Sequence, residues 1–466
     1  MLWVTWMNAA LNLKSACSRA KTFFWMIVFL MAITIRSELA GVTSFIRALS
    51  LKEYCYDRLL DFLHSPALDI EKLTKAWVQL VLKIFPKPLI INQRLVLLGD
   101  GIKVSKEGKK MPSVKCLHQE SDSNSKAEYI MGHSCQALSL LVSAIGTFFA
   151  VPLICRIHEG LKFSNRDKTT LLDKMVSLVS SIDISKSCYL VVDNYYANQK
   201  MIRGMLNQNH HLVTRLQSKA VAYTLISPPS GHRGRGRPKK YGDKVKLKTL
   251  FDALKEFTTI KSHIYDDKNV MIQYRVSQLY WRSAGTIVQI VHVIHPKRGK
   301  IMLMTTDLTL SPVDLIMLYA LRYKIEFSFK QSLRVLGTYA YHFWMKAMKP
   351  ISRRSGNQHL HHNSIGYRER IKRKMSAYHR HIQLGLIAQG LLQYLACTMA
   401  DTVWMKFGSW LRTIRTGIPP SEQVTALALK HSLPEFFADR RNYRIFKKFL
   451  LERIDFARSD GIKLAA

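Results

Sequence analysis

The chain has 466 residues, too many for one compact core, and this length predicts several domains. Its hydrophobic share of 48% and charged share of 22% are ordinary for globular proteins and exclude a disordered or collagen-like chain. Lys and Arg number 70 against 32 Asp and Glu, so the formal net charge of +38 favours a polyanionic partner: nucleic acid first, an anionic membrane surface second.

An apolar segment near the start, Phe23 to Ile35, is the main argument for a membrane. It reads FFWMIVFLMAITI behind Arg19 and Lys21, like the apolar region of a signal peptide. A membrane-spanning helix needs about 20 apolar residues, and no small-x-small cleavage pattern follows. We therefore expect a buried core helix, with export or anchoring as the alternative.

Helical periodicity continues from Leu39 to about Pro88, with apolar residues recurring at spacings of three and four. The period changes at Arg94, where RLVLLGDGIKV reads as a short apolar strand. Two more strands are expected at 135–145 and 148–157.

An alternation of helices and strands follows. We expect a helix at 167–180, a strand CYLVVD ending at Asp193, a helix at 197–207 and a strand HLVTRL. This alternation predicts an α/β sheet.

Between residues 217 and 301 the pattern changes to loops and alternating strands, with strand candidates at 272–281 and 286–294. A basic loop, GHRGRGRPKKY, lies near its start. We interpret this region as a β-rich insertion.

The strand IMLMTTD and a helix opening at Ser311 return the chain to α/β structure. Ser311 suits the N-cap, Pro312 the first helical position and Asp314 the positive end of the helix dipole, and we expect this helix to reach about Leu336. A basic, polar stretch and an apolar helix at 382–399 follow. Seven scattered cysteines without a C-x-x-C pair predict neither a zinc site nor a disulfide framework, and fit a reducing cytosol.

Three acids are the candidates for chemistry. Asp100 and Asp193 each end an apolar strand, where a sheet presents side chains to a ligand crevice. Either acid alone is explained as well by a turn. Glu326 shares one helix face with Tyr319, Arg322, Lys330 and Leu333, although an ion-pair ladder on a solvated helix has the same spacing.

These residues carry a family resemblance. Tyr319-x2-Arg322-x3-Glu326, after Asp100 and Asp193, resembles bacterial insertion-sequence transposases of the DDE type, in the ribonuclease H-like, integrase-like superfamily and its subgroup with a Y-x2-R-x3-E-x6-K signature. The match runs from about Leu39 to Lys346 and includes MPSVKCLHQ, DNYYAN and RGRPKKYG. At the position of the final lysine this chain has Leu333, so the lysine's expected DNA contact passes to Lys330 or Arg334, or the copy is impaired.

The resemblance implies an α/β fold with a ribonuclease H-like mixed sheet. On this interpretation, residues 1–90 form a helical region that binds DNA ends. Residues 91–216 and 302–346 form the catalytic core, interrupted by the insertion at 217–301, and residues 347–466 form a basic helical region.

The implied chemistry is phosphodiester hydrolysis and transesterification at two Mg²⁺ ions about 4 Å apart, for which Mn²⁺ substitutes. Asp100 is expected to bridge the ions, while Asp193 and Glu326 each hold one. Arg322 and Tyr319 are expected to bind the DNA backbone.

Further DNA contacts are expected outside the acids. Arg235 and Arg237, followed by Lys239 and Lys240, resemble an AT-hook that lies in a narrow minor groove, with a solvated basic loop as the alternative. The resemblance suggests that Trp281 holds a flipped base, although a strand tryptophan is more often core. Basic groups at 368–374 and 440–448 are expected to contact phosphates, and the histidines at 359, 361 and 362 are interpreted as loop residues.

The sequence thus predicts a DNA transposase that cuts transposon ends and joins them to target DNA. The expected protein is a homodimer that binds terminal inverted repeats in the bacterial cytoplasm, associated with the nucleoid and without a membrane partner. The alternatives are a metal-dependent nuclease that does not join strands, an inactive DNA-binding remnant and a membrane-associated basic protein.

Overall fold

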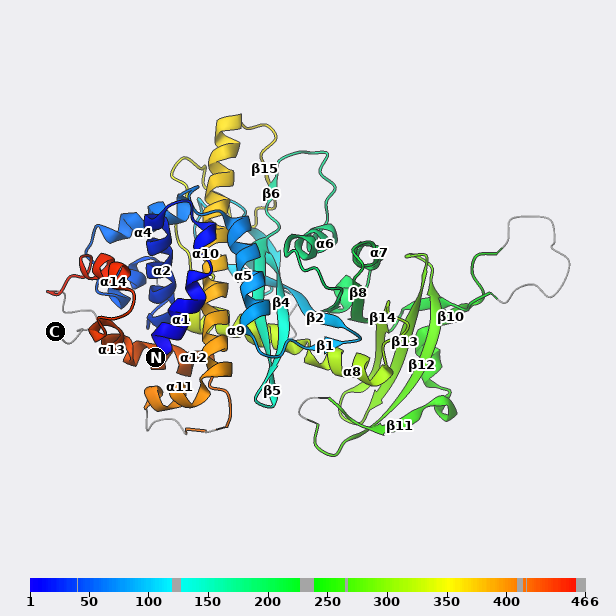
Figure 1. Ribbon diagram of the computed structural model, residues 1–466. Coiled ribbons are helices and arrows are strands. Elements are labelled where there is room, and N and C mark those ends of the chain that lie inside the picture. The colour runs from blue at the N-terminus through cyan, green and yellow to red at the C-terminus, as the bar shows by residue number, and fades with distance from the viewer. Residues whose placement is uncertain are drawn as a thin grey trace.

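The structure is a computed structural model that describes residues 1–39, 41–119, 127–226, 239–264, 267–408, 414–415 and 417–457. A large mixed sheet runs through the protein, helices from both ends of the chain gather around one end of it, and the strands of the insertion form its other end (Figure 1). The α/β class with a mixed sheet, predicted from the sequence, is confirmed.

The N-terminal region is helical up to the first strand. Its helices are α1 (Leu2–Leu11), α2 (Ala20–Ile35), α3 (Thr43–Ala48), α4 (Cys55–His64) and α5 (Ile70–Ile84). Asp69 caps α5 by accepting hydrogen bonds from the backbone N–H groups of Glu71 and Lys72. The predicted core helix is confirmed, because the side chains of α2 from Met26 to Ile33 are entirely buried.

The centre of the sheet has the strand order β5-β4-β2-β7-β8. Strands β2, β7 and β8 run parallel, while β4 is antiparallel to both β2 and β5. The bounds are β1 (Ile90–Ile91), β2 (Arg94–Ser105), β3 (Lys115–His118), β4 (Tyr129–Ala144), β5 (Thr147–Ile157), β6 (Leu161–Lys162), β7 (Cys188–Val192) and β8 (His211–Arg215). The connecting helices are α6 (Leu171–Ser181) and α7 (Gln199–Asn207).

The strands of residues 217–301 continue the same sheet. Strand β14 pairs antiparallel with β8, and β13 and β12 follow in turn, so the sheet passes from the central strands into the insertion without interruption. The bounds are β9 (Val221–Tyr223), β10 (Lys244–Lys246), β11 (Thr258–Lys261), β12 (Met271–Trp281), β13 (Thr286–His295) and β14 (Gly299–Thr305).

The helix that carries Glu326 differs from its prediction. Ser311 caps α8 (Pro312–Leu321) as expected, but the chain is not one helix up to Leu336. It breaks at Arg322 into α9 (Tyr323–Gln331), because the N–H of Arg322 bonds to the carbonyl of Tyr319, three residues back. A π-helical turn at Ser332–Leu336 then ends the segment at Gly337, which has a φ of 59°.

The C-terminal region is organised by one long helix. The predicted helix at 382–399 is α10 (Ile365–Thr398), so the preceding basic run belongs to the same helix and not to a separate stretch. Helix α10 packs on β5, α2, α4, α5 and α12. The remaining elements are β15 (Gln358–His359), α11 (Ala400–Phe407), α12 (Glu422–His431), α13 (Leu433–Ala438) and α14 (Arg444–Leu451).

Within the described residues, no single helix is both long and apolar enough to cross a membrane. Helices α10 and α11 together are long and apolar enough, but the chain bends by 103° between them.

Candidate active site

Strand alternation directs Asp100 and Asp193 to the same face of the sheet. On β2, Val96 and Leu98 lie in an apolar core with Ile325 of α9, and Asp100 follows two residues later on the same side. On β7, Val191 faces that core as well, and Asp193 is again two residues further on. Both acids therefore face the side of the sheet on which α8 and α9 pack. Asp193 directly follows the carboxyl end of β7, whereas Asp100 lies within β2, which continues to Ser105, so the prediction that Asp100 ends its strand is wrong.

Arg322 connects Asp100 with Glu326. Its Nη1 lies 3.0 Å from Oδ2 of Asp100, and its Nη2 bonds to Oε1 of Glu326 one turn later on α9. The side chain of Asp100 is 17% exposed and that of Arg322 is 18% exposed, so this pair is largely shielded from water. The structure thus brings Glu326 to the same side of the sheet as Asp100.

The three acids are also linked electrostatically. Burial raises the pKa of Asp100 to about 6, the Arg322 charge and the Gly101 N–H act against this rise, and the charges of Asp193 and Glu326 add to it. Asp193 is held by its own turn, where its Oδ1 accepts from the N–H of Tyr195 at 3.0 Å and its carbonyl accepts from Oγ1 of Thr214 at 2.6 Å.

The donor set suits a divalent metal ion by its chemistry, because three carboxylates offer the hard oxygen ligands that Mg²⁺ takes. In the described part of the chain, however, no three His, Cys, Asp or Glu side chains are arranged so that they could hold a metal ion together. The Arg322 guanidinium is the positive charge between Asp100 and Glu326.

Tyr319 and Arg215 extend the site beyond the acids. Tyr319 lines a cavity of about 530 Å³ together with Arg215, Arg298 and Arg322. Burial raises the pKa of the Tyr319 phenol, the charges of Arg322 and Arg215 lower it and that of Asp193 raises it, which places this ring among the same charges as the acids.

A polar chain beside Asp100 was missed by sequence reasoning. Gln136 on β4 donates to the Tyr196 hydroxyl at 3.0 Å, and its Oε1 lies 2.7 Å from Nδ1 of His158. The charges of Asp100 and Asp193 help to raise the pKa of Tyr196, after burial itself. The motif DNYYAN contained Tyr196, but nothing in the β4 sequence distinguished Gln136 from any other strand residue.

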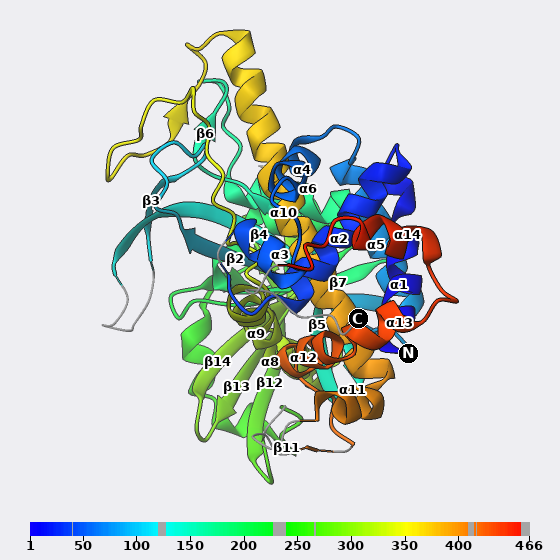
Figure 2. The ribbon, with the colours of Figure 1, turned by 90° about the vertical axis from the view of Figure 1, so that its left-hand side faces the viewer.

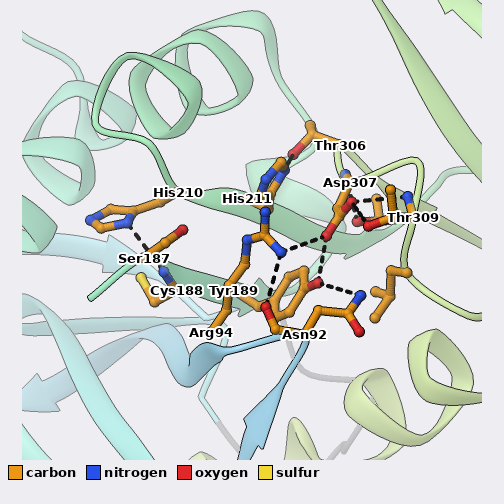
Figure 3. Close-up of polar contacts among 12 residues, drawn as sticks. Asn92, Arg94, Ser187, Cys188, Tyr189, His210, His211, Thr306, Asp307 and Thr309 are labelled. Atoms are coloured by element: carbon orange, nitrogen blue, oxygen red, sulfur yellow. Dashed lines mark hydrogen bonds and ion pairs between the residues drawn. The ribbon is translucent and has the colours of Figure 1, made fainter.

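A fourth acid, Asp307, lies at the opposite end of the same strands. Tyr189, at the start of β7, donates to its Oδ2 at 2.5 Å, and Nη1 of Arg94 lies 3.3 Å from that oxygen (Figure 3). Burial alone would raise the pKa of Asp307, but donation from Tyr189 and Thr309 holds it below its usual value. This acid therefore belongs to a structural network and not to the candidate site.

The other predicted DNA contacts lie apart from the acids. Lys330 and Arg334 are exposed beyond Glu326, and Leu333 between them is 40% exposed. Trp281 ends β12, and its half-buried ring packs against the main apolar core. Lys239 and Lys240 are exposed, whereas Arg235 and Arg237 lie outside the described residues. Among the histidines, the rings of His361 and His362 are 4.0 Å apart.

Comparison with known protein families identifies the family of this chain. The family model described as DDE superfamily endonuclease matches residues 42–282, which is more than half of the chain and includes Asp100 and Asp193 but ends before Glu326. No curated protein matches.

Two solved structures resemble this chain, both with low sequence identity and a low TM-score. A piggyBac transposase synaptic complex with hairpin DNA is 10% identical with a TM-score of 0.38, covering 94% of this chain and 77% of that one. The NurA nuclease from Sulfolobus solfataricus is 10% identical with a TM-score of 0.23, covering 58% of this chain and 86% of that one. The family match over most of the chain shows that this protein belongs to the DDE superfamily endonucleases.

Proposed function

We propose that the protein is a DNA transposase that cuts transposon ends and joins them to target DNA, with Asp100, Asp193 and Glu326 holding two divalent cations, Mg²⁺ in the cell. The observation that carries this proposal is that Arg322 pairs with both Asp100 and Glu326, which are distant in sequence, while the charges of Asp193 and Glu326 act on Asp100. Two bound cations supply an activated water or 3′-hydroxyl and stabilise the leaving oxygen.

Each side chain has a role in this proposal. The side chain of Asp100 is more buried than that of Glu326, and the charges of both Asp193 and Glu326 act on it, so Asp100 would serve as a ligand shared by the two cations. Asp193 and Glu326 each complete one cation site. Because its pKa is raised to about 6, Asp100 takes up a proton more readily than an ordinary aspartate when the pH falls towards 6, and a bound cation would compete with that proton.

Arg322 is proposed to change partners during catalysis. Without cations it neutralises Asp100 and Glu326. With cations bound to those acids, the planar guanidinium would be available to bind a DNA phosphate through two parallel hydrogen bonds. Tyr319 and Arg215 lie close enough to add further backbone contacts.

The wider DNA interface remains a proposal from the sequence. Lys330, Arg334, Lys239 and Lys240 are exposed and can reach phosphates, and two copies of the chain would bring two transposon ends together. Trp281 stays a candidate for stacking on a base, and Arg235 with Arg237 for the minor groove.

A nuclease that cuts without joining is the second candidate, because the family description names endonuclease activity alone. Pre-cut duplex ends with free 3′-hydroxyls, incubated with supercoiled plasmid and Mg²⁺ or Mn²⁺, separate the two. A transposase yields plasmid molecules covalently joined to the ends. A protein that cleaves uncut ends but never yields joined products is a nuclease.

A further inference from the structure

A second groove begins one helical turn beyond Glu326. It has a volume of about 500 Å³ and lies between α9 with its π-helical turn, the C-terminal end of α2 and helix α12. Residues of both α9 and α12 line it, and Figure 2 shows these two helices next to each other. Its walls thus come from the predicted catalytic core and from both terminal regions.

The groove is lined by cations and by no described acid. The positively charged residues are Arg36 of α2, Lys330 of α9, Arg334 of the π-helical turn and Lys430 of α12. Lys330 and Arg334 are exposed, and Lys430 is half-buried. Four like charges around one groove repel one another unless an anion lies between them, which indicates a polyanionic occupant.

Arg36 gives the groove a fixed wall. Only 6% of this residue is exposed, and its Nη2 donates to the carbonyls of Leu336 at 2.5 Å and Gly337 at 3.0 Å. Its Nη1 donates to Oγ of Ser44 at 2.9 Å. These bonds join the end of α2 to the end of the segment that carries Lys330 and Arg334. The Nε of Arg36 is buried and has no hydrogen-bond partner among the described residues.

We infer that this groove binds the sugar-phosphate backbone of the DNA strand that leaves the catalytic acids, with Lys430 as a contact contributed by the C-terminal region. The inference rests on the proposed function, which makes DNA the polyanion that reaches Glu326. It also accounts for Leu333: the two cations that flank it at 330 and 334 line the groove, whereas Leu333 does not.

The test is the salt dependence of DNA binding without divalent metal, measured by fluorescence anisotropy with a labelled 40-base-pair duplex of mixed sequence. Lys430→Gln removes one groove charge, and Lys330→Gln with Arg334→Gln removes two more. The logarithm of the affinity falls with the logarithm of the salt concentration, and each lost phosphate contact should make this fall less steep by about 0.9. Each lost contact should also weaken binding several-fold at about 0.1 M salt. Lys186→Gln is the matched control, because Lys186 is exposed and precedes β7, at the end of that strand opposite Asp193; it should bind as the unchanged protein does.

Equal slopes for Lys430→Gln and the unchanged protein would overturn the inference. The inference would also be wrong if the groove binds only small anions. In that case, inorganic pyrophosphate would raise the melting temperature of the unchanged protein but not of Lys430→Gln, and the two proteins would show the same salt dependence of DNA binding. DNA binding is measured without metal, so this test of the groove does not depend on whether the protein cleaves or joins DNA. A protein that never cleaves DNA can still show the groove-dependent slope, and a cleaving protein can lack it.

Discussion

Asp100 lies within β2, and the charges of Arg322, Asp193 and Glu326 act on it. Burial and the nearby acids raise its pKa to about 6, from an ordinary value of 3.8. The folded protein therefore holds this proton more tightly than the unfolded chain. The resulting contribution to stability is present below about pH 4 and is lost as the pH rises through 6.

Activity should have the opposite pH dependence, because only the carboxylate form of Asp100 binds a cation. We expect the single-turnover cleavage rate to rise as the pH increases through about 6 and then to level off. The measurement uses saturating duplex DNA and sub-saturating Mg²⁺ from pH 5 to 8, because saturating Mg²⁺ would displace the proton and move the rise to lower pH, and circular dichroism confirms the fold at each pH. A rate that does not change between pH 5 and 7 would contradict this role.

Arg322 should matter most when metal is absent. Arg322→Gln leaves Asp100 and Glu326 without their cation, and we expect the free energy of unfolding to fall by about 1–3 kcal/mol. Mg²⁺ should recover most of that loss, because it supplies the missing positive charge. Thermal melts of both proteins with and without Mg²⁺ measure the difference.

Arg47→Gln is the matched control, since Arg47 pairs with Glu38 on the surface, where the two side chains are 33% and 47% exposed. It should cost under about 1 kcal/mol and be insensitive to Mg²⁺. An Arg322→Gln loss that is the same in both conditions would show that Arg322 does not substitute for metal.

At the scale of elements, α9 is fixed by buried polar bonds from α10. Nε2 of Gln389 donates to Oγ and to the carbonyl of Ser328 at 3.1 Å, and Ser332 donates to its Oε1. These serines follow Glu326 on the same segment, so Gln389 helps to set the position of that acid.

Gln389→Ala should therefore lower both stability and cleavage. Leaving Ser328 and Ser332 buried without a partner is expected to cost about 1–3 kcal/mol in urea unfolding. Gln423→Ala, on the exposed side of α12, is the comparison and should stay within about 0.5 kcal/mol. If Gln389→Ala unfolds at the same urea concentration as the unchanged protein, the bond network does not hold α9.

Local patterns predicted some elements and failed at others for physical reasons. The sequence Ser311-Pro312-Val313-Asp314 identified the start of α8, because capping depends on adjacent residues. The break at Arg322 was not visible, since it follows from packing of α8 and α9 against the sheet. Helix α10 was predicted too short because the many basic residues of its first half outweigh its narrow apolar face of Ile371, Met375 and Tyr378.

The same distinction applies to the site. Strand ends and helix spacing were enough to select Asp100, Asp193 and Glu326 as candidates, because those signals are local. The contact between Arg322 and Asp100, 222 positions apart, and the chain from Gln136 to Tyr196 depend on tertiary pairing that no single sequence displays.

At the scale of the whole molecule, one apolar core joins both ends of the chain, from Leu2 in α1 to Ile454 beyond α14. Phe29 lies at its centre, fully buried, with its ring 4.7 Å from that of Phe45 and 5.4 Å from that of His381. The terminal regions should therefore unfold together with the sheet.

Phe29→Ala tests this coupling and should lower the free energy of unfolding by about 3–5 kcal/mol. Hydrogen exchange should speed up in α2 and in β7 alike, because one core stabilises both. Phe456→Ala is the control, as Phe456 is 71% exposed and should change little. Faster exchange confined to α2 would show that the N-terminal helices unfold independently.

The most direct test of the catalytic trio is metal-dependent DNA cleavage by Asp193→Ala beside Asp183→Ala. Asp183 is a surface acid that pairs with Lys75, and its side chain is 67% exposed. We predict that Asp193→Ala loses cleavage by at least about 1,000-fold while binding duplex DNA and folding normally, and that Asp183→Ala cleaves at the unchanged rate. Cleavage that survives in Asp193→Ala would remove the three acids from catalysis.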